Sequence, residues 1–217
     1  PGFNTSSDPE FGLFGGTYTA TAEATYSPSE NFNLRLLYNR TRIQAIGGVI
    51  GGATGEPIYG IADNGSSAVF DPVTGLVADG GLDAGLADTF GVNFDWLVTR
   101  GIGLFGRYTY AKTNLVPGDG EIEAQAVQAG VAFPDLGKEG ALLTISYVRP
   151  FAILDGRDFL VAGGGNGGVQ YEFEANYYFP LTDNIALVPA FYLIANPNNF
   201  SDNPTIYVGN LRAQFSF

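Results

Sequence analysis

The 217-residue sequence predicts an all-β fold, an antiparallel transmembrane β-barrel, from three observations. Its last segment alternates apolar and polar residues, and its composition is rich in glycine and aromatic residues. The connections between its predicted strands are short on one rim and mostly longer on the other. In the segment that ends at Phe217, one face carries Leu211, Ala213 and Phe215, and the other carries polar side chains. Side chains alternate across a strand. An apolar outer face and a wet interior are typical of strands in a membrane barrel.

The same alternation recurs along the chain. The first predicted strand sets Ala and Tyr against Thr and Glu, the third sets Phe, Val and Trp against Asn and Asp, and the seventh sets aromatic residues against Glu and Asn. The pattern is weakest in 122–134, where Ala and Gln blur it, and in 141–153, where Arg149 falls on the apolar side. Nine strands are predicted, over residues 12–26, 32–46, 86–99, 102–114, 122–134, 141–153, 169–182, 185–196 and 204–217.

The connections between these strands differ in length in a regular way. Short turns are predicted at 27–30, 99–101, 135–140 and 182–184, and all of them fall on the rim that also holds the C-terminal residue. Outer-membrane barrels have short turns on the periplasmic rim and longer loops outside. A soluble β-protein is the alternative explanation of the alternation, since its strands also have one polar face. A soluble β-protein has no reason to place its short turns on one rim and its longer loops on the other, so the membrane barrel is favoured.

The longer connections cover 47–85, 154–168 and 197–203, while 117–121 is a short exception on their rim. Segment 47–85 is too long for an ordinary connection, carries acidic residues and no Lys or Arg, and is expected to narrow the pore or to form an outer lid. The run Gly163–Gly168 matches the spacing of a phosphate-binding loop, but it leads into a strand rather than a helix. It is therefore expected to be a flexible outer loop.

Composition excludes several function classes. The chain has no Cys and no His, which removes thiolate nucleophiles, disulfides and the most frequent metal ligands. The net charge of −12 disfavours nucleic acid as a partner. No run of about 20 apolar residues is present, and a mean hydropathy of +0.08 is compatible with a barrel, in which alternation hides the apolar face. No cofactor or metal is expected, and any secretion leader lies outside the sequence or has been removed.

Aromatic residues gather at the ends of the predicted strands, as expected for the two girdles of a membrane barrel. Ordinary packing aromatics are the alternative for any single residue. The membrane-interface aromatics predicted toward the short-turn rim are Tyr26, Trp96, Tyr177, Phe179, Phe215 and Phe217.

The polar faces carry the candidate functional residues, which are expected to line the pore and to give it a slight preference for cations. A solvated wall without any tuned role is the alternative. The predicted pore-lining residues are Glu23, Arg35, Asp95, Arg107, Glu172, Glu174 and Arg212. Two of them, Glu172 and Glu174, lie about 7 Å apart along one strand face, a spacing that could suit acid–base chemistry on a glycosidic bond. No apolar pocket is evident beside them, so an enzyme is not expected.

Several stretches resemble the C-terminal part of cyanobacterial outer-membrane porins. They are Ala132–Ala141, Tyr177–Ile185, Pro189–Tyr192 and Tyr207–Arg212, within a resemblance that extends from about residue 12 to the end of the chain. These proteins are similar to the carbohydrate-selective porin family and are often called iron-uptake porins. One departure is that Arg212 stands where the insertion signal of such barrels has Gly.

The resemblance implies a longer protein with a signal peptide, an S-layer-homology domain that grips the cell wall, a helical connector and a barrel of about sixteen strands. Residues 1–217 are then the C-terminal part of that barrel, with 1–11 as the remnant of an outer loop and no second domain. The expected partners are outer-membrane lipid, the remaining N-terminal strands, two further copies in a homotrimer, and peptidoglycan through the absent N-terminal domain. The expected function is passive diffusion of small hydrophilic solutes and inorganic ions, iron or carbohydrates among them, in the cyanobacterial outer membrane. The alternative is a structural anchor that tethers the membrane to peptidoglycan.

Overall fold

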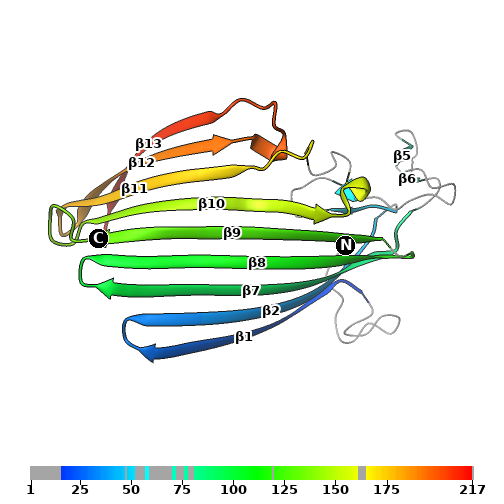
Figure 1. Cartoon of the computed structure of the whole chain (residues 1–217), viewed down its shortest axis with the longest axis horizontal. Coiled ribbons are helices and arrows are strands. Elements are labelled where there is room, and N and C mark those ends of the chain that lie inside the picture. Colours follow the sequence, from blue (N-terminus) through cyan, green and yellow to red (C-terminus); the bar gives the residue numbers. More distant parts are fainter. Residues whose placement is uncertain are drawn as a thin grey trace.

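The computed structural model describes residues 16–46, 48–51, 57–58, 70–71, 76–77, 81–118, 120–160 and 165–216. Figure 1 shows one large curved sheet whose strands run side by side in chain order. Its nine strands are β1 (Tyr18–Ser29), β2 (Phe32–Gln44), β7 (Ala84–Thr99), β8 (Ile102–Val116), β9 (Glu121–Pro134), β10 (Leu142–Asp155), β11 (Tyr171–Thr182), β12 (Ile185–Ala195) and β13 (Ile206–Phe215).

The all-β prediction is confirmed, and the nine predicted strands match the nine strands of the sheet to within a few residues, apart from the start of the first. Every neighbouring pair is antiparallel. The first strand begins at Tyr18, and the predicted part before Gly16 lies outside the described residues. Among the described residues no helix is long and apolar enough to cross a bilayer.

Smaller elements lie between the strands. Two short hairpins, β3 (Ile50–Gly51) with β4 (Pro57–Ile58) and β5 (Phe70–Asp71) with β6 (Leu76–Val77), belong to the long segment between β2 and β7. Two single-turn 3₁₀ helices follow β10 and β12, η1 (Arg157–Phe159) and η2 (Pro197–Asn199).

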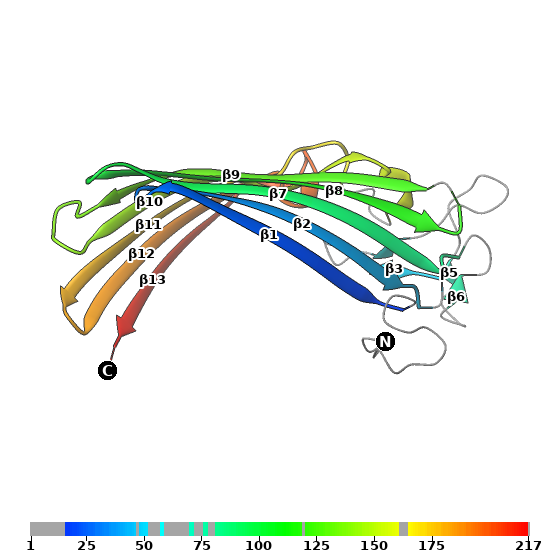
Figure 2. The ribbon, with the colours of Figure 1, turned by 90° about the horizontal axis from the view of Figure 1, so that it is seen from below.

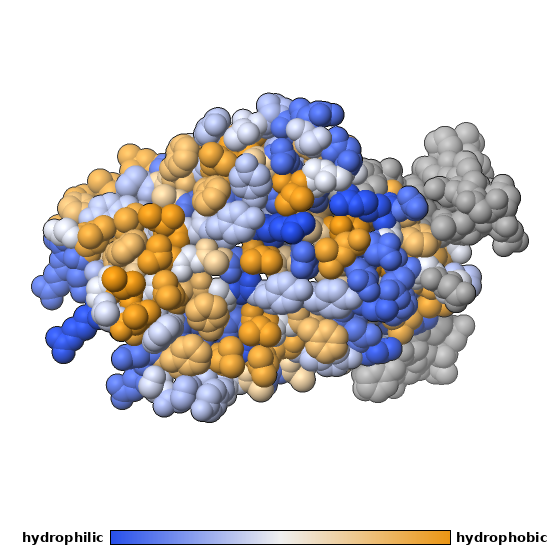
Figure 3. Space-filling model, in the orientation of Figure 1, coloured by the Kyte–Doolittle hydropathy of each residue, from blue (hydrophilic) through white to orange (hydrophobic). Residues whose placement is uncertain are grey.

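The sheet is strongly arched, and its two faces differ in polarity. Figure 2 shows β9 near the crest of the arch, with β1 and β13 at its two sides. The convex face carries exposed apolar side chains such as Trp96, Leu104 and Phe173. Figure 3 shows hydrophobic residues over much of this face. Exposed apolar area on this scale needs an apolar partner, and lipid supplies it for a membrane barrel.

The strands are tilted, as closure into a barrel requires. One row of hydrogen-bonded neighbours runs from Trp96 on β7 through β8, β9 and β10 to Ala175 on β11. Strand β7 ends three residues beyond Trp96, at Thr99, whereas β11 ends seven residues beyond Ala175, at Thr182. The strand ends on the side of the short turns are thus staggered across the sheet, as tilted strands require.

The short turns and the C-terminal residues lie together at one end of the sheet (Figure 1). The predicted interface aromatics that are described lie near this end on the convex face. Trp96 packs edge-on against Phe32 at 6.4 Å between ring centroids, and Tyr177 lies 5.8 Å from Phe179. Tyr26 and Phe215 are exposed, and Phe217 lies outside the described residues.

Two further aromatic groups lie on the convex face, closer to the end of the sheet that carries the long loops. Tyr38 contacts Phe90 at 5.1 Å, and Tyr147, Tyr171 and Phe173 form a cluster on β10 and β11. From Tyr38 and Phe90 toward the long loops, the convex face carries charged side chains. Ion pairs join Arg40 to Asp88 and Lys112 to Glu121 across neighbouring strands. The apolar zone is therefore bounded on the side of the long loops by aromatic rings and then by ion pairs.

Arg149 lies on the convex face, as its place in the alternation predicts. It stands opposite Val127, in the same alternation as Tyr147. Its Nε atom is buried and has no hydrogen-bond partner.

Candidate functional site: the polar wall

The concave face of the sheet carries the polar side chains. Residues that pair across an antiparallel ladder point to the same face, so the register decides which side chains are neighbours. One such row runs Thr25, Arg35, Asn93, Arg107, Gln128, Val148, Glu172 and Ile194. The alternation places Glu23, Asp95, Glu174 and Arg212 on this same face. All seven residues predicted to line a pore therefore share one side of the sheet.

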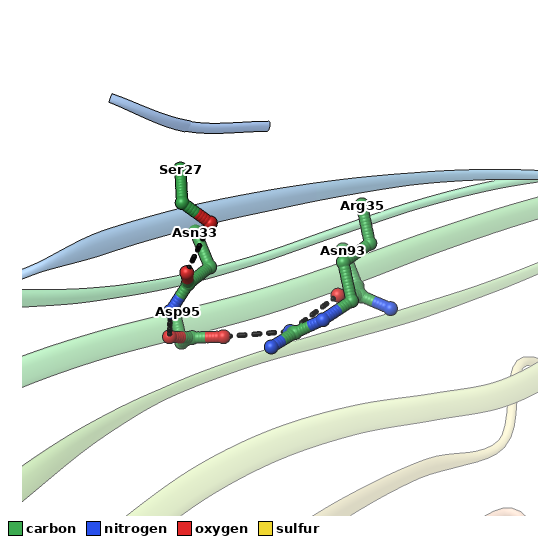
Figure 4. A network of polar contacts seen from close by, with 5 residues as sticks. All are labelled: Ser27, Asn33, Arg35, Asn93 and Asp95. Carbon is green, nitrogen blue, oxygen red and sulfur yellow. Dashed lines mark hydrogen bonds and ion pairs between the residues drawn. The ribbon is translucent and has the colours of Figure 1, made fainter. Parts of the chain in front are cut away.

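Four of them form two groups. The first is a hydrogen-bonded network on β1, β2 and β7 with an ion pair at its centre (Figure 4). Arg35 Nη1 lies 2.7 Å from Asp95 Oδ1 and donates a second bond of 3.2 Å to Asn93 Oδ1. Asn33 Nδ2 donates to the other carboxylate oxygen of Asp95 at 2.6 Å, and Ser27 Oγ donates to Asn33 Oδ1 at 2.6 Å. The network fixes the orientation of both charged groups.

The Arg35 and Asp95 side chains are 38% and 47% exposed, so water screens the pair and its contribution to stability is small, below about 1 kcal/mol. Its consequence for a pore is electrostatic. The two charges cancel at distances much larger than their separation. Of the seven predicted residues, the remaining charges are Glu23, Glu172 and Glu174 against Arg107 and Arg212.

The second group lies on β11, β12 and β13. Glu174 accepts a hydrogen bond from Asn176 Nδ2, and the register sets Glu174 opposite Tyr192. Together with Asn210 and Arg212 these side chains line a cavity of about 330 Å³ in the concave face. The remaining walls of the cavity are Val188 and Ala190. A carboxylate, two amides, a guanidinium and a phenol thus surround one hollow.

Glu172 lies one step further toward the long loops on the same face. Its Oε1 accepts a 2.6 Å hydrogen bond from Gln170 Nε2. The two carboxylates singled out in the sequence are therefore each held by an amide two residues away in the chain, Gln170 for Glu172 and Asn176 for Glu174.

Reasoning from the sequence missed Tyr192, Asn33 and Asn93 as members of these groups. Asn33 and Asn93 lie on the predicted inward side of their strands, whereas no face is predicted for the strand that carries Tyr192. The neighbours of all three depend on the pairing register. Asn33 and Asn93 follow from the register of β2 with β7, in which Asn33 stands opposite Asp95 and Arg35 opposite Asn93. In the described part of the chain, His, Cys, Asp and Glu side chains do not gather in threes to hold a metal ion.

The base of the long segment between β2 and β7 lies over the concave face near the outer end of the sheet. Ile50 and Leu82 are buried against Leu115, Ile122 and Leu160. Backbone hydrogen bonds join Leu82 N to Gly48 O at 2.9 Å and Asp83 N to Val116 O at 2.6 Å. The rest of the segment, apart from its two short hairpins, lies outside the described residues.

Comparison with known proteins agrees with this architecture. Residues 2–217 match the family described as "Carbohydrate-selective porin, OprB family". The uncharacterized protein alr4550 of Nostoc sp. is 26% identical over 212 residues, covering 96% of this chain and 33% of that protein. The uncharacterized protein sll0772 of Synechocystis sp. is 36% identical over 88 residues, covering 41% of this chain and 16% of that protein. The chain thus spans a third or less of these relatives.

Among solved structures, the NanC porin is similar with a TM-score of 0.43 and 9% sequence identity, over 93% of this chain and 94% of that one. The family match covers almost the whole sequence, and the sheet is apolar on its convex side and polar on its concave side. The chain belongs to the carbohydrate-selective porin, OprB family, and its place is the outer membrane of bacteria with a Gram-negative type of envelope.

Proposed function

We propose that this chain forms part of the wall of a passive pore for small hydrophilic solutes, with carbohydrates as the preferred class. The observation that carries the proposal is the cavity formed by Glu174, Asn176, Tyr192, Asn210 and Arg212 on the concave face. A carboxylate accepts hydrogen bonds from hydroxyls, a guanidinium donates them, and amides do both. A tyrosine ring adds an amphipathic surface that suits the apolar faces of a sugar.

The two free edges of the sheet support a second part of the proposal. β1 and β13 each pair on one side only among the described residues. Unpaired backbone groups cannot face lipid, because each costs several kcal/mol in the bilayer core. We infer that further strands of the same polypeptide, outside these 217 residues, complete the barrel. The relatives, of which this chain covers a third or less, are long enough to supply them.

Inorganic ions would pass through the same water-filled opening, and iron is one proposed cargo by resemblance alone. A role as membrane anchor rests on the expected N-terminal wall-binding domain, to which no residue of the described sheet contributes. A homotrimer is likewise proposed by resemblance.

The decisive experiment is single-channel recording of the full-length protein in planar bilayers. Stepwise ionic conductance is expected, and a neutral disaccharide added at millimolar concentration should partly block the current. Tyr192→Ala should weaken that block, whereas Ile194→Ala, on the same strand and face but outside the cavity, should leave it unchanged. The absence of conductance would overturn the pore. Conductance with equal sugar block in Tyr192→Ala and in the unmodified protein would overturn the carbohydrate assignment.

A further inference from the structure

Two outer loops, which join β10 to β11 and β12 to β13, are fastened to each other. Asn199, in the second loop, is only 1% exposed. Its Oδ1 accepts a hydrogen bond from Gln170 N at 2.8 Å, and its backbone carbonyl accepts one from Asn166 N at 3.2 Å. Asn196 Nδ2 donates to Val169 O at 3.0 Å. The contact therefore involves both backbones as well as side chains.

Asn166 and its neighbouring glycines complete the contact. Asn166 Oδ1 accepts from Ser201 N at 2.8 Å, and Asn166 Nδ2 donates to Ser201 Oγ at 3.1 Å. Gly165 has a φ of +99°, and a Cβ there would lie 2.2 Å from Asn199 O. At Gly168 a Cβ would lie 2.6 Å from Ser201 N. The glycine run expected from the sequence to be a flexible loop is, over residues 165–168, closely packed against the second loop.

Gln170 connects this pair of loops to the polar wall. Its backbone N–H donates to Asn199, its Oε1 accepts from Asn198 N at 2.7 Å, and its Nε2 donates to Glu172 Oε1 at 2.6 Å. An amide has one acceptor and one donor end. Because the acceptor end faces the Asn198 N–H, the donor end faces the Glu172 carboxyl group, which accepts this bond.

We propose that Gln170 is a positioning residue that couples the two outer loops to Glu172 in the pore wall. Gln170 holds the Glu172 carboxylate at one place on the wall and, in return, Glu172 stabilises the loop that covers 196–203. The role as a pore-wall charge rests on the proposed function, whereas the coupling between loop and carboxylate does not. Coupling of this kind is reciprocal, so a change at either end must be felt at the other.

Glu174 provides the matched control. It has the same type of partner, an amide two residues away, since Asn176 Nδ2 donates to it. Among the described residues, Asn176 forms no side-chain hydrogen bond with either of the two loops. Removing the carboxylate of Glu172 should therefore loosen the loop, and removing that of Glu174 should not.

The test measures amide hydrogen exchange in 196–203 of the full-length protein in detergent micelles. Gln170→Leu removes the acceptor of the Asn198 N–H, and Glu172→Leu removes the carboxylate that holds the Gln170 amide, so each should speed exchange at Asn198 by about tenfold or more. Glu174→Leu should change it less than twofold. The exchanged pair Gln170→Glu with Glu172→Gln keeps both bonds and the net charge, because the new carboxylate accepts from Asn198 and from the new amide. Exchange in this double variant should return close to the original rate.

The proposal is overturned if Glu172→Leu and Glu174→Leu affect Asn198 equally, or if the exchanged pair is as fast as Gln170→Leu. Either outcome would make Gln170 a local structural residue. The exchange measurement does not depend on conduction, so a protein that fails to conduct while showing this pattern would overturn the pore and retain the coupling. In bilayers, the effect of Glu172→Gln on the reversal potential should be smaller in a Gln170→Leu background, where the carboxylate is no longer held.

Discussion

The ion pair between Arg35 and Asp95 shows how one contact decides what a charged residue does on this wall. Asp95 is held by Asn33 on one oxygen and by Arg35 on the other. Side chains that are this exposed contribute little to stability when paired. At distances much larger than their separation, their charges act on a passing ion only when one of them is removed.

Removing one partner should therefore change selectivity in a predictable direction. Asp95→Asn leaves Arg35 uncompensated and should shift the reversal potential of the full-length pore toward anions. Arg35→Gln should shift it toward cations, and the double variant should return near the original value. Reversal potentials in a salt gradient measure this, and thermal unfolding should move little in all three proteins. A double variant that differs from the original as much as the single variants do would show that the pair does not cancel.

At the scale of elements, strands and faces could be predicted because both depend on a period of two. Alternation in β11 is regular enough to assign the inward position of Glu172 and Glu174 without any structure. Registers could not be predicted in the same way. The turn pairs Thr182 with Ile185, and a regular ladder from there would set Glu174 opposite Leu193. The irregularity between Pro180 and Thr182 shifts the pairing by one, so Glu174 faces Tyr192. The cavity depends on this shift, and no pattern in the sequence predicts it.

The segment between β2 and β7 is a second case in which sequence could set only alternatives. Its length predicts a special role, but the contact of Ile50 with Leu115 joins residues far apart in the chain. An apolar cluster on a face that is otherwise wet indicates that the base of this segment folds over the wall rather than away from it. The described residues support inward packing at the base, and a constriction further along stays a prediction.

Ile50→Ala should release this base. Leu115 is 2% exposed, and residues 1–217 contain no Cys. The reactivity of a Leu115→Cys variant therefore measures how well the base of the segment shields this position from water. Labelling by a water-soluble maleimide should be slow in that variant and at least about tenfold faster when Ile50→Ala is added, since truncating a buried Ile costs about 2–5 kcal/mol. Ile46→Ala, four residues earlier and exposed, is the control. Equal labelling with both substitutions would show that Ile50 does not cover Leu115.

At the scale of the whole molecule, the different polarity of the two faces predicts how the sheet is oriented in the membrane. The convex side should contact lipid and the concave side water. A cysteine scan of β11 in the full-length protein should label positions 172, 174 and 176 with membrane-impermeant reagents and leave 173, 175 and 177 unlabelled. Labelling of each variant in lipid vesicles, followed by mass spectrometry, measures both sets under the same conditions. Similar labelling of even and odd positions would contradict a lipid-facing convex side.

The balance of charge over the wall leads to the last prediction. With Arg35 and Asp95 paired, Glu23, Glu172 and Glu174 outnumber Arg107 and Arg212 on the concave face. A charged wall concentrates counter-ions in a water-filled pore, and salt weakens this as the Debye length falls from about 30 Å at 0.01 M to about 3 Å at 1 M. The full-length pore should therefore prefer cations modestly in dilute salt and lose the preference near 1 M salt.

Replacing both Glu172 and Glu174 by Gln should move the reversal potential toward anions in dilute salt and leave it unchanged near 1 M. Folding should be retained, because substitutions on the lumen side tune selectivity more than stability. Reversal potentials across a tenfold salt gradient, repeated at several mean concentrations, separate this effect from a change in pore size. A pore that stays anion-selective in dilute salt, or that does not respond to the double substitution, would show that strands outside this chain set the selectivity.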